Sequence, residues 1–407
     1  MISYVMYLLI LQIKILLKKK SNYLKKNKSN LFKMKENPQS ILLYVKLLKT
    51  RNFFKYVNKF KTTLSSPSIL IDKNNKIITD PTKIANNLQD HFKSVYSNPN
   101  LNLNEIINFD KPEILYPLPD FEVSTDDVIK AIDKMKLFSA CPKNNIPSIV
   151  FKKCKFTICR PLQLFFQKSF LLGIVPSAYK FNQVTPLHKK GPKTDSSNFR
   201  PIVLTPHEIK ICERILRSKL VIYFESNKIF NSSQHGFRNN RSCLTQLLVH
   251  TQNIINDLVS NNSVDTFYID YAKAFDKVDH LILLKKLEHY GVTDRYLIWI
   301  KSFLSGRKQV VNINNVFSYE ADVTSGVPQG SVLSTLFFII FSNDLQNNIT
   351  HSNILAFADD TKLILPINST LDTLHLQEDI NSIISWSDTN NMKLNKNKFE
   401  LITHNID

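Results

Sequence analysis

Two aspartates lie side by side between two apolar runs in ILAFADDTKLIL, residues 354–365. The apolar runs predict two short strands, and Asp359 and Asp360 stand where the chain should turn, a position that Asp tolerates because its side chain can bond nearby backbone. Adjacent carboxylates repel each other, which raises the pKa of one of them unless a cation or a hydrogen-bond donor is close. The hairpin tip is therefore either a solvated turn or half of a metal site, and a partner acid elsewhere would favour the metal site.

A candidate partner acid lies in FYIDYAKAFDKVDH. Residues 267–269 are a β-prone run that ends at Asp270, after which the pattern becomes helical, so we predict Asp270 at the C-terminal end of a buried strand. If this strand neighbours the hairpin in one sheet, three carboxylates surround a common point. Such a cluster can bind two Mg²⁺ ions about 4 Å apart, which clamp the attacking and leaving oxygens of a phosphoryl transfer. With both elements present, the metal site is favoured over the plain turn.

Between these two elements, SGVPQGSVLSTLFFIIFSNDL predicts a turn with Gly and Pro, followed by a long apolar helix. Gly326 and Gly330 let the backbone approach a flat ligand closely, and Gln329 can donate and accept hydrogen bonds at a base edge or a sugar. A turn followed by a core helix accounts for the same residues, so this segment alone assigns no function.

Three segments upstream of Asp270 carry helix signals. Residues 82–96 predict one helix, and Ser124 in STDD is an N-cap with an acid three residues further on. Apolar residues between positions 244 and 258 recur at helical spacing and predict an amphipathic helix. Prolines punctuate residues 184–206, so no long helix is expected there.

Basic residues concentrate at the N-terminus. Residues 1–61 contain 15 Lys and Arg but one acid, Glu36, and so carry +14 of the formal net charge of +19. Such a segment is either an arm for a polyanion, with salt-sensitive affinity, or a solvated charge run. The apolar start, residues 1–17, is too short and too interrupted to span a bilayer, and we expect no stable membrane association. The five cysteines form no C-x-x-C pair, which predicts neither a disulfide framework nor a structural zinc.

Seven motifs stand in a fixed order along the chain: VTPLHKKG, NFRPI, QHGFR, FYIDYAKAFDKVDH, SGVPQGSVLS, FADD and WSDTNNMKLNKNK. From about Ile71 to the end, this series resembles the reverse transcriptase domain of non-LTR, LINE-type, jockey-like retrotransposons. The resemblance implies an α+β right-hand polymerase with fingers and a palm built on an antiparallel sheet. It divides the chain into a basic arm (1–62), a connector (63–118), a fingers region (119–262) and a palm region (263–407).

The resemblance also implies the catalytic roles. Asp270, Asp359 and Asp360 match the acids that hold two Mg²⁺ ions, with Asp270 and Asp359 as the direct ligands of both metals. Phe275 matches a steric gate that crowds a ribose 2′-OH and so favours dNTP substrates; an ordinary core phenylalanine is the alternative. Lys398, in LNKNK, matches a lysine near the leaving pyrophosphate, and its role as general acid is a hypothesis.

Further residues match substrate contacts in the family. Lys189 or Lys190, together with Arg200, matches the contacts to the incoming triphosphate, and the choice between the two lysines stays open; a solvated basic loop is the alternative. Gln329 and Gly330 match the turn that packs on the nascent base pair. The QHGFR segment, including its arginine, matches a template-facing part of the fingers.

The chain departs from the family pattern in places. Ser334 and Thr335 stand where Gly-Pro is usual, so the following helix could lengthen or shift, and CPKNNIP stands where PGPDGIP is typical. No catalytic acid is lost. In the family a primer-grip hairpin and a thumb would follow Asp407, and an endonuclease domain would come first. We therefore expect a fragment without a thumb, with weak or no processive synthesis.

The expected function is an RNA-directed DNA polymerase, which adds dNTPs to a DNA primer on an RNA template. The alternative is a truncated noncatalytic relic that binds RNA. The intact acids and Phe275 favour the polymerase, since binding alone would not require them. The resemblance further implies an element ribonucleoprotein as partner and a nuclear location, and it also allows a cytoplasmic ribonucleoprotein.

Overall fold

The structure is a computed structural model that describes residues 67–405 apart from positions 73, 98–110, 144 and 261. The predicted basic arm and the apolar segment 1–17 lie outside the described residues, as does part of the predicted connector. In the part that is described, no helix has the length and apolar character needed to cross a membrane. The strands are β1 (Leu70–Ile71), β2 (Ile77–Ile78), β3 (Phe181–His188), β4 (Phe199–Leu204), β5 (Ser263–Ile269), β6 (Arg307–Ile313), β7 (Val316–Phe317), β8 (Ala321–Val323), β9 (Asn353–Phe357), β10 (Asp360–Ile367) and β11 (Glu400–His404). The α-helices are α5 (Pro81–Ser94), α6 (Thr125–Asp133), α7 (Ser148–Lys153), α8 (Lys155–Leu172), α9 (His207–Ser226), α10 (Cys243–Val259), α11 (Ala274–Lys277), α12 (His280–His289), α13 (Asp294–Leu304), α14 (Ser334–Phe341) and α15 (Thr370–Thr389). The 3₁₀ turns are η3 (Ser177–Tyr179), η4 (Ser196–Asn198), η5 (Asn343–Asn348) and η6 (Lys396–Lys398).

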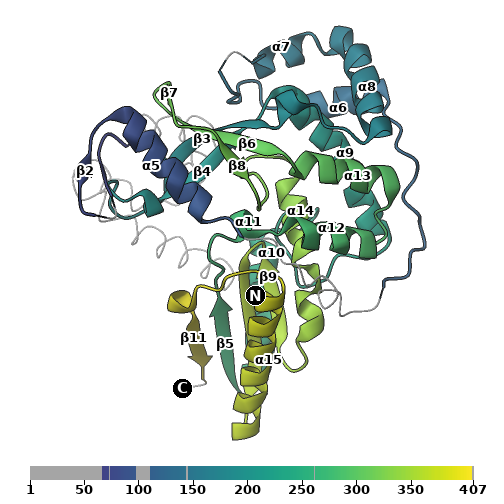
Figure 1. The fold of residues 1–407 in the computed structure, drawn as a ribbon. Helices are drawn as coiled ribbons and strands as arrows, with labels where there is room; N and C mark the ends of the chain where they lie inside the picture. The colour runs from purple at the N-terminus through teal and green to yellow at the C-terminus, as the bar shows by residue number, and fades with distance from the viewer. Residues whose placement is uncertain (1–66, 73, 98–110, 144, 261, 406–407) are drawn as a thin grey trace, which may run out of the picture. The chain divides into compact units, whose positions relative to one another are not determined.

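One sheet carries the predicted acids and consists of four antiparallel strands in the order β11, β5, β10, β9 (Figure 1). β9 and β10 form the predicted hairpin, and β5 is the predicted strand before Asp270, so both predictions are confirmed. Side chains of β10 alternate between the two faces: Leu363 and Leu365 join the main core, whereas Ile364 packs in a smaller cluster. α15 covers the first face and α10 packs on the second.

A second sheet has the strand order β4, β3, β6, β7, with β8 paired to β6. Its strands run antiparallel except for β3 and β6, which are parallel. α5 packs against this sheet and places Ile84, Leu88 and Phe92 in one buried cluster with Val184 and Val311. The helix predicted over residues 82–96 is thereby confirmed, and it packs on strands more than 80 residues further along the chain.

The helices begin where side chains cap them. Ser124, Ser242 and Ser369 each accept a hydrogen bond from the third residue of the helix that follows, and the side chain of that third residue bonds back to the capping residue. The predicted N-cap at Ser124 is therefore confirmed. Helices and antiparallel sheets together agree with the predicted α+β class.

Two details differ from the sequence-based expectation. The apolar helix after the Gly and Pro turn is short, since α14 ends at Phe341 and the 3₁₀ turn η5 follows. α10 forms where predicted, but Leu244 and Leu248 are 63% and 61% exposed, because this helix turns Gln246 and His250 toward the protein instead. Helical spacing predicted the helix but not which side would pack.

Candidate active site

The three predicted acids lie at one edge of the four-stranded sheet. Ala358 turns the chain with φ 58°, Asp359 follows, and Asp360 begins β10 opposite Phe357. On the other side of β10, Thr361 pairs with Ile269 of β5, so Asp270 follows directly beyond that pair. The sheet register therefore brings together two acids of the hairpin and one acid from a strand 90 residues earlier in the chain.

Charge repulsion is visible at Asp359, which is half-buried. Burial raises the pKa of its carboxyl group, and the nearby Asp360 and Asp270 raise it further, while its own backbone N–H and Arg200 act in the opposite direction. A cation placed among the three carboxylates would relieve this repulsion.

A lysine ammonium already neutralises one of the acids. Lys398 Nζ lies 2.5 Å from Asp270 Oδ2, and Asn395 Nδ2 donates to the same oxygen at 3.3 Å. The segment is fixed beside β5 because Asn395 N donates to the carbonyl of Asp270 at 2.8 Å. Sequence reasoning selected Lys398 but missed Asn395, although both stand in LNKNK.

Basic side chains from the five-stranded sheet face the same acids. Arg200 on β4 pairs with Leu187 of β3, and Lys189 follows this hairpin strand. Burial lowers the pKa of Lys189, and the positive charges of Arg200 and Lys398 lower it further, while Asp270 raises it. Lys189 and Arg200 therefore lie close enough to the acids for their charges to act on one another.

An open cleft of about 500 Å³ lies over the acids. Its lining includes Lys190, Asp270, Asp360 and Lys398, and its size suits a small-molecule ligand. Lys362 also lines it and was not predicted; burial lowers the pKa of its ammonium group to about 8. The signal was present in the sequence, since Lys362 is two residues from Asp360 on one strand and therefore shares its face.

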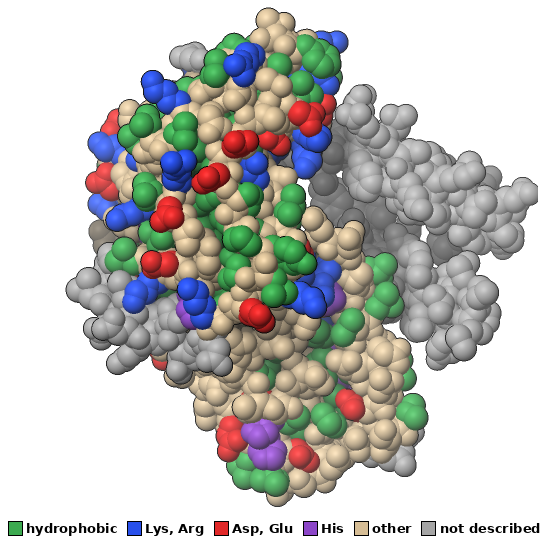
Figure 2. Space-filling view, turned by 90° about the vertical axis from the view of Figure 1, so that its right-hand side faces the viewer, with side chains coloured by type: hydrophobic (Ala, Val, Ile, Leu, Met, Phe, Trp, Pro, Cys, Tyr) green, Lys and Arg blue, Asp and Glu red, His purple; other side chains and the backbone are tan. Residues whose placement is uncertain are grey.

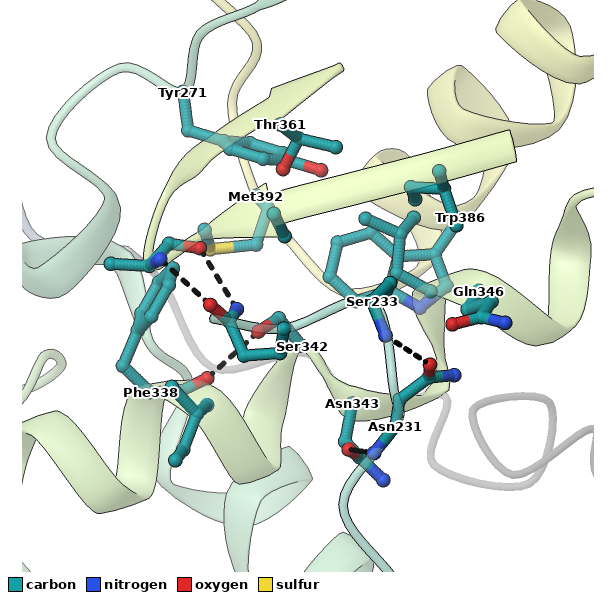
Figure 3. Close-up of a pocket in the computed structure, with 16 residues that line it drawn as sticks. Asn231, Ser233, Tyr271, Phe338, Ser342, Asn343, Gln346, Thr361, Trp386 and Met392 are labelled. Carbon is teal, nitrogen blue, oxygen red and sulfur yellow. Dashed lines mark hydrogen bonds between the residues drawn. The ribbon is translucent and has the colours of Figure 1, made fainter. Parts of the chain in front are cut away.

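A separate cavity lies beneath the hairpin (Figure 3) and measures only about 20 Å³. Asn231, Ser233, Phe338, Ser342 and Trp386 are among the residues around it, and hydrogen bonds join several of them. Such a volume holds about one water molecule, so this cavity is a packing gap behind the acids and not a substrate site.

The QHGFR segment holds the acid hairpin in place. Gln234 Oε1 accepts from the backbone N–H groups of Ala358 at 2.9 Å and Gly236 at 2.7 Å, and Gln234 Nε2 donates to the carbonyl of Ala358. Arg238 does not face open space as the template-facing expectation requires. Its guanidinium is mostly buried and bonds Glu225 at 2.7 Å and the carbonyl of Asn231 at 2.7 Å.

Replacing Gly236 with Ala is expected to displace the hairpin tip. A Cβ at this position would lie 2.3 Å from the backbone nitrogen of Ala358, and backbone atoms cannot yield as a flexible side chain can. We expect a loss of about 1–3 kcal/mol in the free energy of unfolding, measured by urea denaturation. Because the hairpin tip carries two of the three acids, the rate of any reaction at these acids is also expected to fall. Ser232→Ala, at an exposed position just before the same segment, is the control and is expected to unfold as wild type does. If the Gly236→Ala protein were as stable as wild type, close packing of Gly236 against the hairpin tip would be contradicted.

The PQG turn joins β4 of the five-stranded sheet to helix α11, which follows Asp270. Gln329 Nε2 donates to both carboxylate oxygens of Asp276 at 2.9 Å, and Gln329 O accepts from Val203 N on β4 at 2.8 Å. Gly330 has φ 129°, and a Cβ there would lie 2.5 Å from the carbonyl oxygen of Val203. The turn thus approaches β4 so closely that only glycine fits.

Asp276 makes stability depend on pH. Burial raises the pKa of its carboxyl from 3.8 to about 6, against the lowering effect of the Gln329 hydrogen bonds. Between pH 4 and 6 the unfolded chain releases this proton while the folded protein keeps it, so stability falls as pH rises through this window and stays level above it. Asp276→Asn is expected to remove that fall and to be more stable at pH 7.5 by up to about 3 kcal/mol, as measured by urea denaturation at pH 4 and pH 7.5. If the free energy of unfolding fell by the same amount between pH 4 and pH 7.5 in wild type and in Asp276→Asn, the carboxyl group of Asp276 would not be the cause.

Phe275 is held in a ring cluster beside the acids. Its ring stacks on Phe338 with centroids 4.7 Å apart and meets Phe237 edge-on at 6.2 Å, and its carbonyl accepts from Val327 N. The half-buried ring is thereby fixed in position close to the strand end that carries Asp270.

The donor set fits a hard divalent cation. Asp270, Asp359 and Asp360 offer only carboxylate oxygens, which Mg²⁺ prefers, and both the Lys398 pair and the raised pKa of Asp359 indicate negative charge that a cation would neutralise. In the described part of the chain, one group of three possible metal ligands has all its donor atoms within 4.8 Å of one another, and the three acids are not part of that group. The acids are therefore spaced more widely and their side chains would rotate to share an ion.

The sequence of this chain is similar to those of several known proteins. A family model described as reverse transcriptase (RNA-dependent DNA polymerase) matches residues 187–407. Similar proteins include the RNA-directed DNA polymerase from mobile element jockey of Drosophila melanogaster, 26% identical over 328 residues, which are 78% of this chain and 36% of the relative. The probable RNA-directed DNA polymerase from transposon BS of the same species is 26% identical over 290 residues, 69% of this chain and 32% of the relative. For the corresponding protein of transposon X-element the identity is 31% over 204 residues, 49% of this chain and 22% of the relative. The chain spans about a third or less of the length of these relatives.

Proposed function

The chain belongs to the reverse transcriptase (RNA-dependent DNA polymerase) family, and we propose that it adds dNTPs to the 3′ end of a DNA primer on an RNA template. The observation that carries this proposal is one cleft lined by Asp270, Asp360, Lys190 and Lys398. Asp359, Lys189 and Arg200 lie close enough for their charges to act on these groups. In this reading the four-stranded sheet is the palm and the five-stranded sheet belongs to the fingers.

Asp270 and Asp359 would hold two Mg²⁺ ions, with Asp360 beside them. When bound, the metal pair supplies positive charge to the attacking primer oxygen and to the leaving phosphate oxygens. The carboxylates of this chain provide the oxygen ligands, and the turn at Ala358 fixes two of them at the sheet edge.

The basic residues act on the triphosphate. Lys189 or Lys190, together with Arg200, neutralises its negative charge and orients it, since a forked guanidinium can bond two phosphate oxygens at once. Lys398 donates a proton to the leaving pyrophosphate in this proposal. Its ammonium group lies 2.5 Å from Asp270 Oδ2, and this contact beside the acids supports the assignment.

Single-nucleotide primer extension tests the proposal. The protein is given a DNA primer annealed to an RNA template, Mg²⁺ and one dNTP at a time. The expected result is incorporation of only the dNTP that pairs with the next template base. Addition of all four dNTPs at equal rates would show untemplated transfer and would refute an RNA-directed polymerase.

Phe275 is the proposed sugar-selecting residue. Phe275→Ala is expected to raise incorporation of rNTPs relative to dNTPs on the order of 10²-fold, because removing the ring leaves room for a 2′ oxygen. The ratio of the two kcat/KM values measures this, and it is insensitive to the fraction of folded protein. Phe275→Tyr keeps the ring and is expected to keep the wild-type ratio. An unchanged ratio in Phe275→Ala would assign the ring to the core alone.

A further inference from the structure

A second cluster of metal-ligating side chains lies at the opposite end of β9 from the acids. His351 stands in the loop between η5 and β9, and His375 and Glu378 lie three residues apart on one side of α15. Their donor atoms all lie within 4.8 Å of one another. Histidine and acidic side chains lie side by side at the lower end of the face in Figure 2.

The fold builds this cluster from two segments that a buried carboxylate joins. Asp379, the residue after Glu378, accepts hydrogen bonds from the backbone N–H groups of Thr350 at 3.0 Å, His351 at 3.2 Å and Ser352 at 2.6 Å. Its side chain is fully buried. The loop that carries His351 is therefore attached to the same turn of α15 that carries the other two ligands.

The side chains themselves are already close. The imidazole rings of His351 and His375 stack with centroids 4.0 Å apart and an angle of 3° between their planes. His351 Nε2 lies 3.2 Å from Glu378 Oε2. Two stacked imidazoles beside a carboxylate bring two nitrogen donors and one oxygen donor to one place.

We propose that His351, His375 and Glu378 form a Zn²⁺ site that fastens the loop before β9 to α15. Two His and one Glu are a donor set that zinc accepts, with water as the fourth ligand. Zinc bonds of about 2.0–2.2 Å place tetrahedral donors roughly 3.3–3.6 Å apart, so modest rotations of these partly exposed side chains suffice. Mg²⁺ prefers oxygen donors, which separates this site chemically from the carboxylates at the other end of β9.

The site has a structural consequence and no role in the reaction. β9 leads from this loop to the turn with Asp359, so a bound ion anchors the start of the hairpin whose tip carries the acids. The sequence analysis predicted no structural zinc because the chain lacks C-x-x-C pairs. That prediction concerned cysteine ligands, whereas this cluster contains only histidine and glutamate.

Zinc titration of the whole chain tests the site. Isothermal calorimetry with Zn²⁺ is carried out in excess Mg²⁺, so that the carboxylates of the cleft do not compete for zinc. One equivalent is expected to bind to wild type, and His375→Gln is expected to weaken that binding at least about tenfold. His289→Gln replaces a histidine of α12 outside the cluster and is expected to bind as wild type does.

Co²⁺ provides a second readout that does not depend on calorimetric heat. In place of zinc it is expected to give the visible absorption bands of a four-coordinate ion in wild type and in His289→Gln, but not in His375→Gln. Metal-free unfolding curves of the three proteins are expected to coincide, because the replaced side chains are outside the main core. Absence of binding to wild type, or equal binding by His375→Gln, would overturn the proposal.

Discussion

Replacing Asp270 with Asn is expected to lower the single-turnover rate of nucleotide incorporation about 10³-fold. The substitution removes one anionic ligand from the carboxylate cluster and leaves the Lys398 ammonium without its partner at 2.5 Å. The side-chain oxygen of Asn can still accept from Asn395, and the backbone bond to Asn395 is untouched, so the strand end keeps its geometry. Rapid-quench measurement at saturating primer, template and dNTP reports the chemical step.

The matched control is Asp322→Asn, an exposed acid on β8 in the other sheet. It changes the net charge by the same amount and is expected to incorporate at the wild-type rate. Equal unfolding midpoints for both variants would show that the loss at Asp270 is chemical. If Asp270→Asn lost less than about tenfold, this carboxylate would not be a metal ligand in the reaction.

The second large effect concerns the buried ion pair behind the acid-bearing sheet. Lys286 Nζ lies 2.6 Å from Asp344 Oδ1, with both side chains almost fully buried, and it also donates to the carbonyl of Phe341. Lys286→Met is expected to lower the free energy of unfolding by about 3–5 kcal/mol, because Asp344 is left buried without its counterion. Urea denaturation at pH 7.5 measures this loss.

Two control variants distinguish the cost of leaving the Asp344 carboxylate buried without a partner from the cost of removing a lysine in general. Lys286→Met combined with Asp344→Asn removes both charges and keeps an acceptor for Trp386 Nε1, so it is expected to recover much of the stability. Lys308→Met breaks an exposed pair with Glu320 and is expected to cost less than about 1 kcal/mol. A similar loss in the Lys286 and Lys308 variants would contradict the account.

Local patterns were enough to predict the elements that carry the three acids. Apolar runs around adjacent aspartates predicted the β9–β10 hairpin, and a β-prone run that ends in Asp270 predicted the end of β5. The capping box at Ser124 marked the start of α6. In each case the signal lies within a few residues, so no knowledge of tertiary contacts was needed.

Contacts between distant segments could not be read in the same way. The Lys398 to Asp270 pair joins residues 128 positions apart, and Gln329 uses its side chain on Asp276. Arg238 was expected to face a template, yet Glu225 and Asn231 engage its guanidinium. These outcomes depend on which segments the fold brings together, and the type of residue alone does not specify its partner.

The parallel pairing of β3 with β6 illustrates the same limit. These strands are separated by more than 100 residues, and the sequence patterns predicted neither of them. Strand direction and neighbours follow from how the connecting helices pack, which periodicity does not encode.

In the proposed function, Asp270, Asp359 and Asp360 form the working centre of an RNA-templated DNA polymerase. The most direct measurement is single-nucleotide extension of a DNA primer on an RNA template with Mg²⁺, comparing wild type with Asp359→Asn combined with Asp360→Asn. Wild type is expected to incorporate the complementary dNTP and the double variant is expected to incorporate none, while both bind primer and template. Incorporation at equal rates by the two proteins, or none by wild type with primer and template bound, would contradict the proposed function.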